Sequence, residues 1–182
     1  MRRILICLVA LPFLLSWDCR PAAPPVSVSN QPITSNGRPL KPVAEMSWTD
    51  SEQRVQKLGD LSGKAVILDF WATYCPPCKE EIPHLNSLIA KYGADNLQIV
   101  GLNVGGAEDL TEIPKFVAKT KIDYPIAFPE DELTRFIFAE RDDIPQTAVF
   151  DRKGKMISKI IGFSPAIQKE LDAAVEQALK PE

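Results

Sequence analysis

Residues 66–78 decide the fold, and they read Val66-Ile67-Leu68-Asp69-Phe70-Trp71-Ala72-Thr73-Tyr74-Cys75-Pro76-Pro77-Cys78. The nearly unbroken apolar run at the start predicts a strand that is buried on both faces. The two prolines end that strand and suit the first turn of a helix. This order places Cys75 at a helix N-terminus, where unpaired N–H groups and the helix dipole favour a thiolate, the nucleophilic form of cysteine.

The second cysteine of the motif, Cys78, lies one helical turn further on, within reach of a disulfide to Cys75. A zinc site needs about four ligands, whereas no second cysteine pair follows and His84 is the only histidine. A structural disulfide across so short a loop would constrain the unfolded chain very little. A redox-active pair is the strongest interpretation, because C-x-x-C beside a βαβ pattern is typical of redox proteins.

The segment from Phe70 to Cys78 resembles the active site of thioredoxin-like proteins. It is most similar to the TlpA/ResA/DsbE-like branch, the membrane-tethered reductases of the bacterial envelope, and the resemblance covers roughly residues 63–180. It implies an α/β, thioredoxin-like fold with a central mixed β-sheet and helices on both faces. It also implies a thiol–disulfide oxidoreductase that needs no cofactor beyond its own Cys75–Cys78 pair and no metal.

Hydrophobic patterns along the chain agree with that fold. A hairpin and a loop are expected over residues 46–63, and the order from residue 66 onward reads β-α-β-α-β-α-β-β-α. The predicted strands are 66–71, 97–104, 125–128, 147–151 and 156–161, and the predicted helices are 76–92, 109–119, 130–140 and one that begins at Pro165 behind a Ser164 cap.

The resemblance assigns roles to the residues of the motif. Cys75 is expected to attack a substrate disulfide, and Cys78 is expected to resolve the mixed disulfide that results. Asp69 lies within the apolar strand, so we expect a buried carboxyl with a raised pKa that takes the proton of Cys78 as a general base. In the ResA-like group a glutamate at the spacing of Glu81 tunes the cysteines; a solvated glutamate near a helix N-terminus is the alternative.

Four further residues are expected to form the substrate-binding surface beside the cysteines. In thioredoxin-like folds the bond between the residues matching Ile144 and Pro145 is cis and faces the disulfide, which leaves the backbone of Ile144 free to pair with a substrate strand. Trp71 and Tyr74 are expected to flank the site.

Pro76 and Pro77 are also expected at this surface, and they bear on the direction of electron flow. Neither has an N–H, so two donors that could hold a thiolate at Cys75 are missing. We expect the pKa of Cys75 to be less depressed than in strongly oxidising relatives, which favours a reductant.

The N-terminus predicts export. Arg2 and Arg3 precede the apolar run Ile4–Trp17, which is short for a membrane span and typical of a signal peptide. Residues 1–19 are therefore expected to be a signal or anchor, and lipidation at Cys19, cleavage elsewhere and an uncleaved anchor all stay open. Proline-rich residues 20–45 are expected to be a flexible linker and residues 46–182 the thioredoxin-like domain.

Together these features predict a thiol–disulfide oxidoreductase in the periplasm or at the outer face of the cell envelope, tethered to the membrane through its N-terminus if the signal is lipidated or left uncleaved. Protein disulfides are the expected substrates, of the cytochrome c maturation or copper-site type, and by resemblance electrons come from a membrane donor of the DsbD/CcdA type. A monomer is expected, and a formal charge of -3 without a basic stripe argues against nucleic acid.

Two other functions compete with this one. A copper metallochaperone would use Cys75 and Cys78 as soft ligands, although three methionines and one histidine are few for a dedicated copper site. A peroxide reductase would need the frame P-x-x-x-[ST]-x-x-C, in which the proline is absent here.

Overall fold

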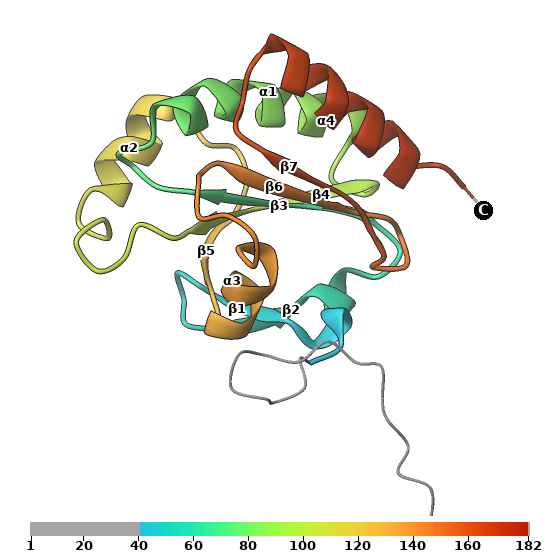
Figure 1. Ribbon diagram of the computed structural model, residues 1–182, viewed down its shortest axis with the longest axis horizontal. Coiled ribbons are helices and arrows are strands. Elements are labelled where there is room, and N and C mark those ends of the chain that lie inside the picture. The colour runs from blue at the N-terminus through green and yellow to red at the C-terminus, as the bar shows by residue number, and fades with distance from the viewer. Residues whose placement is uncertain (1–40, 182) are drawn as a thin grey trace, which may run out of the picture. The chain divides into compact units, whose positions relative to one another are not determined.

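Strand β3 (Ala65–Trp71) lies inside a sheet of seven strands in the computed structural model, which describes residues 41–181 (Figure 1). It pairs in parallel with β4 (Leu97–Asn103) and antiparallel with β6 (Gln146–Phe150), and all seven of its residues are buried. The apolar run therefore forms a strand covered on both faces, as predicted.

The sheet order is β2-β1-β5-β4-β3-β6-β7, with both parallel and antiparallel pairs. The remaining strands are β1 (Ser47–Asp50), β2 (Val55–Lys57), β5 (Ile126–Pro129) and β7 (Met156–Ile161); the helices are α1 (Pro76–Tyr92), α2 (Ile113–Thr120), α3 (Asp131–Ile137) and α4 (Pro165–Ala178), with 3-10 turns η1 (Val43–Glu45) and η2 (Leu58–Leu61).

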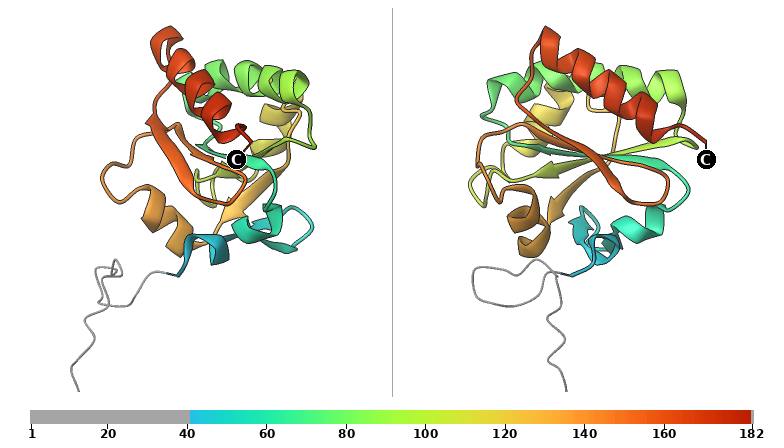
Figure 2. Two further views of the ribbon diagram at one scale, coloured as in Figure 1. Left: turned by 90° about the vertical axis from the view of Figure 1, so that its right-hand side faces the viewer. Right: turned by 45° about the vertical axis from the view of Figure 1, so that its right-hand side comes forward.

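Helices cover both faces of the sheet, which confirms the predicted fold class (Figures 1 and 2). Alternate residues of β3 point to opposite sides, because side chains alternate along a strand. Ile67 packs in one apolar cluster with residues of α1, α2 and α4, whereas Leu68 packs in a second cluster with residues of α3 and β1. Asp69 is two residues beyond Ile67 and therefore lies on the α1 side.

Two helices differ from their predicted bounds. Helix α2 begins at Ile113 rather than at Asp109, because the Asp109 side chain folds back to bind the loop before Cys75 and the residues between form turns. Helix α3 ends at Ile137 rather than at residue 140. Helix α1 continues through Pro83 to Tyr92 and stops at Gly93, the predicted terminator.

A glycine in β4 makes room for two large side chains over the sheet. A Cβ atom at Gly101 would lie 2.9 Å from Trp71 Nε1 and 2.9 Å from the ring of Tyr124. Both side chains can therefore cross β4 only because this position has no side chain. Trp71 in turn stacks on Phe116 of α2, with ring centroids 4.9 Å apart.

The described chain begins on the α3 side of the sheet. The backbone N–H of Lys41 donates to Glu132 (2.8 Å), and its Nζ lies 2.7 Å from a carboxylate oxygen of Glu130. Lys41 and η1 lie within the predicted linker 20–45, whose earlier residues, like the predicted signal 1–19 and Cys19, lie outside the described residues. Over residues 41–181 none of the helices has the length and apolar character of a membrane span.

Candidate active site

The two cysteines occupy the first turn of α1 and form a disulfide with a Cα–Cα distance of 5.4 Å. Cys75 is the N-cap residue of the helix, and its sulfur accepts a hydrogen bond from the backbone N–H of Cys78 at 3.2 Å. This is the predicted position, where helix N–H groups face the sulfur. Both residues are buried, with Cys75 4% and Cys78 1% exposed.

The prolines set the number of N–H groups that the sulfur of Cys75 can use. Pro76 and Pro77 hold the first two helical positions. A capping side chain accepts hydrogen bonds from the second and third helical residues. Pro77 has no N–H to give, so Cys78 is the one donor to Cys75 among the described residues.

Two carboxyl groups are buried on the α1 side of the sheet, one on β3 and one on α1. Asp69 and Glu81 are each 1% exposed. Burial raises the pKa of Asp69 to about 7, against a hydrogen bond from the Tyr124 hydroxyl at 3.0 Å, which acts in the opposite direction. Burial first, and the charge of Asp69 second, raise the pKa of Glu81 well above its ordinary value, while a 2.6 Å hydrogen bond from the Thr147 hydroxyl lowers it. The solvated alternative for Glu81 is therefore excluded.

The residues expected to contact substrate divide into two groups. Tyr74 is 65% exposed beside the disulfide, and the Ile144–Pro145 bond is cis, as the resemblance implies. Ile144 packs against the cluster that contains both cysteines, and among the described residues its backbone makes no hydrogen bond. The prediction that Trp71 lies at the substrate-binding surface is wrong. Trp71 is fully buried on the α1 side of the sheet, so it packs below the site and does not line its surface.

A hydrogen-bonded cluster centred on Asp109, here called the Asp109 cluster, lies next to the disulfide. The sequence did not predict it. The carboxylate of Asp109 accepts hydrogen bonds from the backbone N–H of Thr73 at 3.0 Å, from the Thr73 hydroxyl and from the Asn103 side-chain amide at 2.7 Å. Asp109 is 4% exposed. Partial burial raises the pKa of Asp109, but the hydrogen bonds from Asn103 and Thr73 outweigh it, so the net shift is downward. The Asp109 cluster thus connects the loop before Cys75 to the end of β4.

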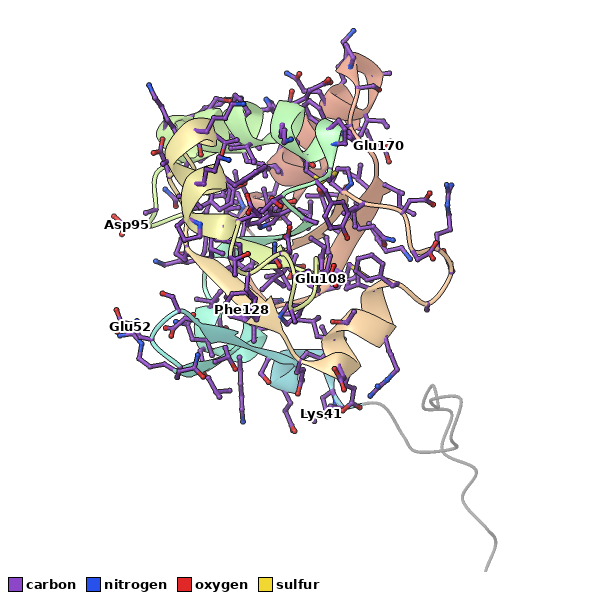
Figure 3. The ribbon with its side chains drawn as sticks, turned by 90° about the vertical axis from the view of Figure 1, so that its left-hand side faces the viewer. Lys41, Glu52, Asp95, Glu108, Phe128 and Glu170 are labelled. Carbon is purple, nitrogen blue, oxygen red and sulfur yellow. A yellow bond between two sulfur atoms is a disulfide. The ribbon has the colours of Figure 1, made fainter. Side chains whose placement is uncertain are left out.

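We expect Asp109→Ala to destabilise the fold by about 1–3 kcal/mol, because it leaves the Thr73 N–H and the Asn103 amide without their acceptor. Urea unfolding measures the loss, and hydrogen exchange at the Thr73 amide reports it locally. Asp95→Ala is the control, since Asp95 is an exposed surface residue (Figure 3). Equal stability of the two variants, with the Thr73 amide still protected from exchange, would show that the Asp109 cluster contributes nothing to the free energy of unfolding.

No group of three or more His, Cys, Asp or Glu side chains that could hold a metal ion occurs within residues 41–181. The cysteine pair is the group in this site that can exchange electrons, by thiol–disulfide chemistry. That the protein works without a further cofactor stays a prediction.

Comparisons with known proteins agree with this geometry. The model of the AhpC/TSA family matches residues 39–159. A thiol-disulfide oxidoreductase ResA of Bacillus cereus is 35% identical over 123 residues, which are 67% of this chain and 69% of that protein. A DsbE-type thiol:disulfide interchange protein from Chlorobium tepidum is similar in structure, with a TM-score of 0.65, 30% identity and coverage of 78% of this chain and 98% of that one. The chain therefore belongs to the AhpC/TSA family, and it is a thioredoxin-like thiol–disulfide oxidoreductase related to ResA and DsbE.

Proposed function

We propose that this oxidoreductase is an extracytoplasmic reductant of protein disulfides, with Cys75 as the attacking and Cys78 as the resolving thiol. The observation that carries the proposal is the position of the Cys75 sulfur at the N-cap of α1, with the Cys78 N–H directed at it and the Cys78 sulfur within bonding distance. A thiolate is stabilised at such a position, and its partner is placed to displace it from a mixed disulfide.

The substrate is a protein segment that reaches the disulfide beside Tyr74. In the proposed complex an extended segment forms backbone hydrogen bonds with Ile144, which has none within the described structure. The cis bond before Pro145 supports this arrangement through the resemblance to thioredoxin-like proteins. Pro76 is exposed and Pro77 half-buried, so both are placed to contribute apolar contacts.

The prolines favour the reducing direction. A dithiol is a strong oxidant when its reduced form is strongly stabilised. Here one helix N–H reaches the Cys75 sulfur, and Pro77 supplies none, so the thiolate at Cys75 receives less stabilisation than a full helix terminus would give. The reduced pair gives up its electrons more readily as a result.

We expect the reduction potential of the Cys75–Cys78 pair to be about -270 mV rather than about -120 mV, the value of a strong oxidant. Equilibration with redox buffers followed by thiol alkylation measures it. Pro77→Ala restores an N–H at the second helical position and should raise the potential, whereas Pro76→Ala restores one at the first position, which does not face the sulfur, and is the matched control. A wild-type value of about -120 mV contradicts the proposed reducing role. Equal shifts in the two variants contradict the role given to the missing N–H of Pro77.

Sequence features outside the described residues support the proposed location. The pair Arg2 and Arg3 followed by the apolar run Ile4–Trp17 is typical of an export signal. With lipidation at Cys19 or an uncleaved signal, the domain would be held at the outer face of the membrane. A membrane donor of the DsbD/CcdA type would then supply electrons, and clients of the cytochrome c maturation or copper-site type would receive them.

A further inference from the structure

A groove of about 460 Å³ lies between α1 and α2. It begins at the redox motif, because Thr73 is two residues before Cys75 and Lys79 directly follows Cys78, and both Thr73 and Lys79 line the groove. The exchange chemistry of the two cysteines uses none of its side chains. Its lining includes Thr73, Lys79, Pro83, Lys115, Phe116 and Lys119.

The groove and the cis bond before Pro145 lie on opposite sides of β3, the strand that leads to the disulfide. Strands β4 and β6 flank β3, and Pro145 directly precedes β6. On the β4 side, the Trp71 side chain lies over Gly101, and Phe116 of α2 stacks on Trp71. A substrate segment that pairs with Ile144 and passes the sulfur atoms would therefore continue toward the groove.

Positive charge dominates the groove. Of the described residues that line it, Glu112 is the one acidic side chain, and three are lysines: Lys79 of α1, and Lys115 and Lys119 of α2. All three lysines are exposed, and within residues 41–181 none of them makes an ion pair. By contrast, Lys91 near the end of α1 lies 3.7 Å from a carboxylate oxygen of α4. In a chain with a formal charge of -3, this local excess of positive charge favours an anionic partner.

The groove also has apolar surface. The Nζ atom of Lys79 lies 5.8 Å from the centre of the Phe116 ring, so the ring face lies beside a positive charge. Tyr74 and Leu110 are 65% and 46% exposed, and they come from the two segments that the Asp109 cluster joins. Exposed aromatic and aliphatic side chains beside lysines suit a protein partner, because protein interfaces combine apolar contacts with charged ones.

We infer that this groove binds an acidic segment of the substrate protein, and that Lys79, Lys115 and Lys119 are the specificity-determining residues that select it. The inference rests on the proposed function and adds the class of substrate, a protein whose reducible cysteine lies near aspartate or glutamate residues. The carboxylates pair with the lysines, while Tyr74 and Leu110 contact apolar neighbours. Complementary charge of this kind speeds encounter, disfavours other partners and weakens as salt is added.

Two synthetic peptides test the charge of the substrate separately from the chemistry. Each is a dimer joined by one disulfide, with either glutamates or glutamines next to its cysteine. In single turnovers, the reduced full-length protein should reduce the glutamate peptide about five- to tenfold faster at low peptide concentration and equally fast at saturation. About 1 M salt should remove this preference, since charges are then screened beyond about 3 Å.

A double variant tests whether the preference comes from the groove. Lys115→Gln/Lys119→Gln should slow reduction of the glutamate peptide about three- to tenfold and leave the glutamine peptide unaffected. Lys169→Gln/Lys180→Gln is the matched control, because it makes the same change in net charge at two exposed lysines in and after α4, and it should keep the preference. Equal losses in the two double variants would show that net charge, and not the groove, selects the peptide, which overturns the inference.

A binding measurement separates this inference from the proposed function. Calorimetry should detect the glutamate peptide, made with serine in place of its cysteine, on the oxidised protein. Binding with no reduction of either disulfide peptide would count against the proposed function and leave the groove standing, whereas reduction of both peptides at equal rates overturns the inference alone. Weaker binding of Lys115→Gln/Lys119→Gln to phosphatidylserine vesicles, with the peptide preference unchanged, would mean that the groove faces lipid and also overturns it.

Discussion

Replacing Cys75 by serine is expected to reduce thiol–disulfide exchange to the uncatalysed rate. The sulfur of Cys75 is the one at the N-cap of α1, where the Cys78 N–H is directed. A serine hydroxyl cannot form the mixed disulfide on which each turnover depends. Reduction of insulin disulfides, followed by turbidity, measures the loss.

Cys78→Ser is the informative partner of that variant. It keeps the attacking sulfur but cannot release the substrate, so the mixed disulfide with Cys75 should accumulate and be visible by mass spectrometry. Substrate trapped by Cys75→Ser, or full turnover by either variant, would mean that the roles of the two cysteines are assigned wrongly.

Replacing Asp69 by asparagine is expected to stabilise the folded protein at pH 8 by up to about 4 kcal/mol and to change little at pH 4. Burial raises the pKa of Asp69 from 3.8 to about 7 in the folded state, and each pKa unit corresponds to about 1.4 kcal/mol. The folded state therefore binds a proton that the unfolded state has lost between pH 3.8 and about 7, so the wild type loses stability as the pH rises through that window. Glu81, whose pKa is also raised, acts with the same sign.

Urea unfolding at a series of pH values checks this result. The wild-type curve should fall between about pH 4 and about pH 8, and the Asp69→Asn curve should fall less. Asp95→Asn is the matched control, because the same change is made on an exposed side chain, and its curve should follow the wild type. A constant difference between Asp69→Asn and wild type at all pH values would mean that the pKa of Asp69 is the same in the folded and unfolded states.

The site residues that can be predicted from the sequence are those fixed by local pattern or family motif. The apolar run of β3 and the prolines after it place Cys75 at a helix N-terminus without any long-range information. The cis bond at Pro145 cannot come from local rules, since cis is a minority state for such bonds; the family resemblance supplies it. The burial of Asp69 follows from its apolar neighbours on the strand.

The rest of the site depends on contacts between distant parts of the chain. Local patterns predict Asp109 at the start of a helix, because nothing nearby in sequence shows that Thr73 needs its carboxylate. The partnership of Tyr124 with Asp69 needs the glycine at 101 and the register of two strands, which no single segment contains. The prediction of Trp71 at the surface is wrong because it rests on closeness to the motif, whereas the place of Trp71 in β3 directs it into the core.

The contact of Lys41 with Glu130 and Glu132 places the start of the described chain on the face of the sheet opposite the cysteines. Lys41, the first described residue, lies on the α3 side of the sheet, whereas the sulfur atoms lie on the α1 side. Figure 1 shows α3 and α1 on opposite faces of the sheet, and Figure 3 labels Lys41. A protein that docks over the cysteines would therefore leave Lys41 and its two acidic partners uncovered.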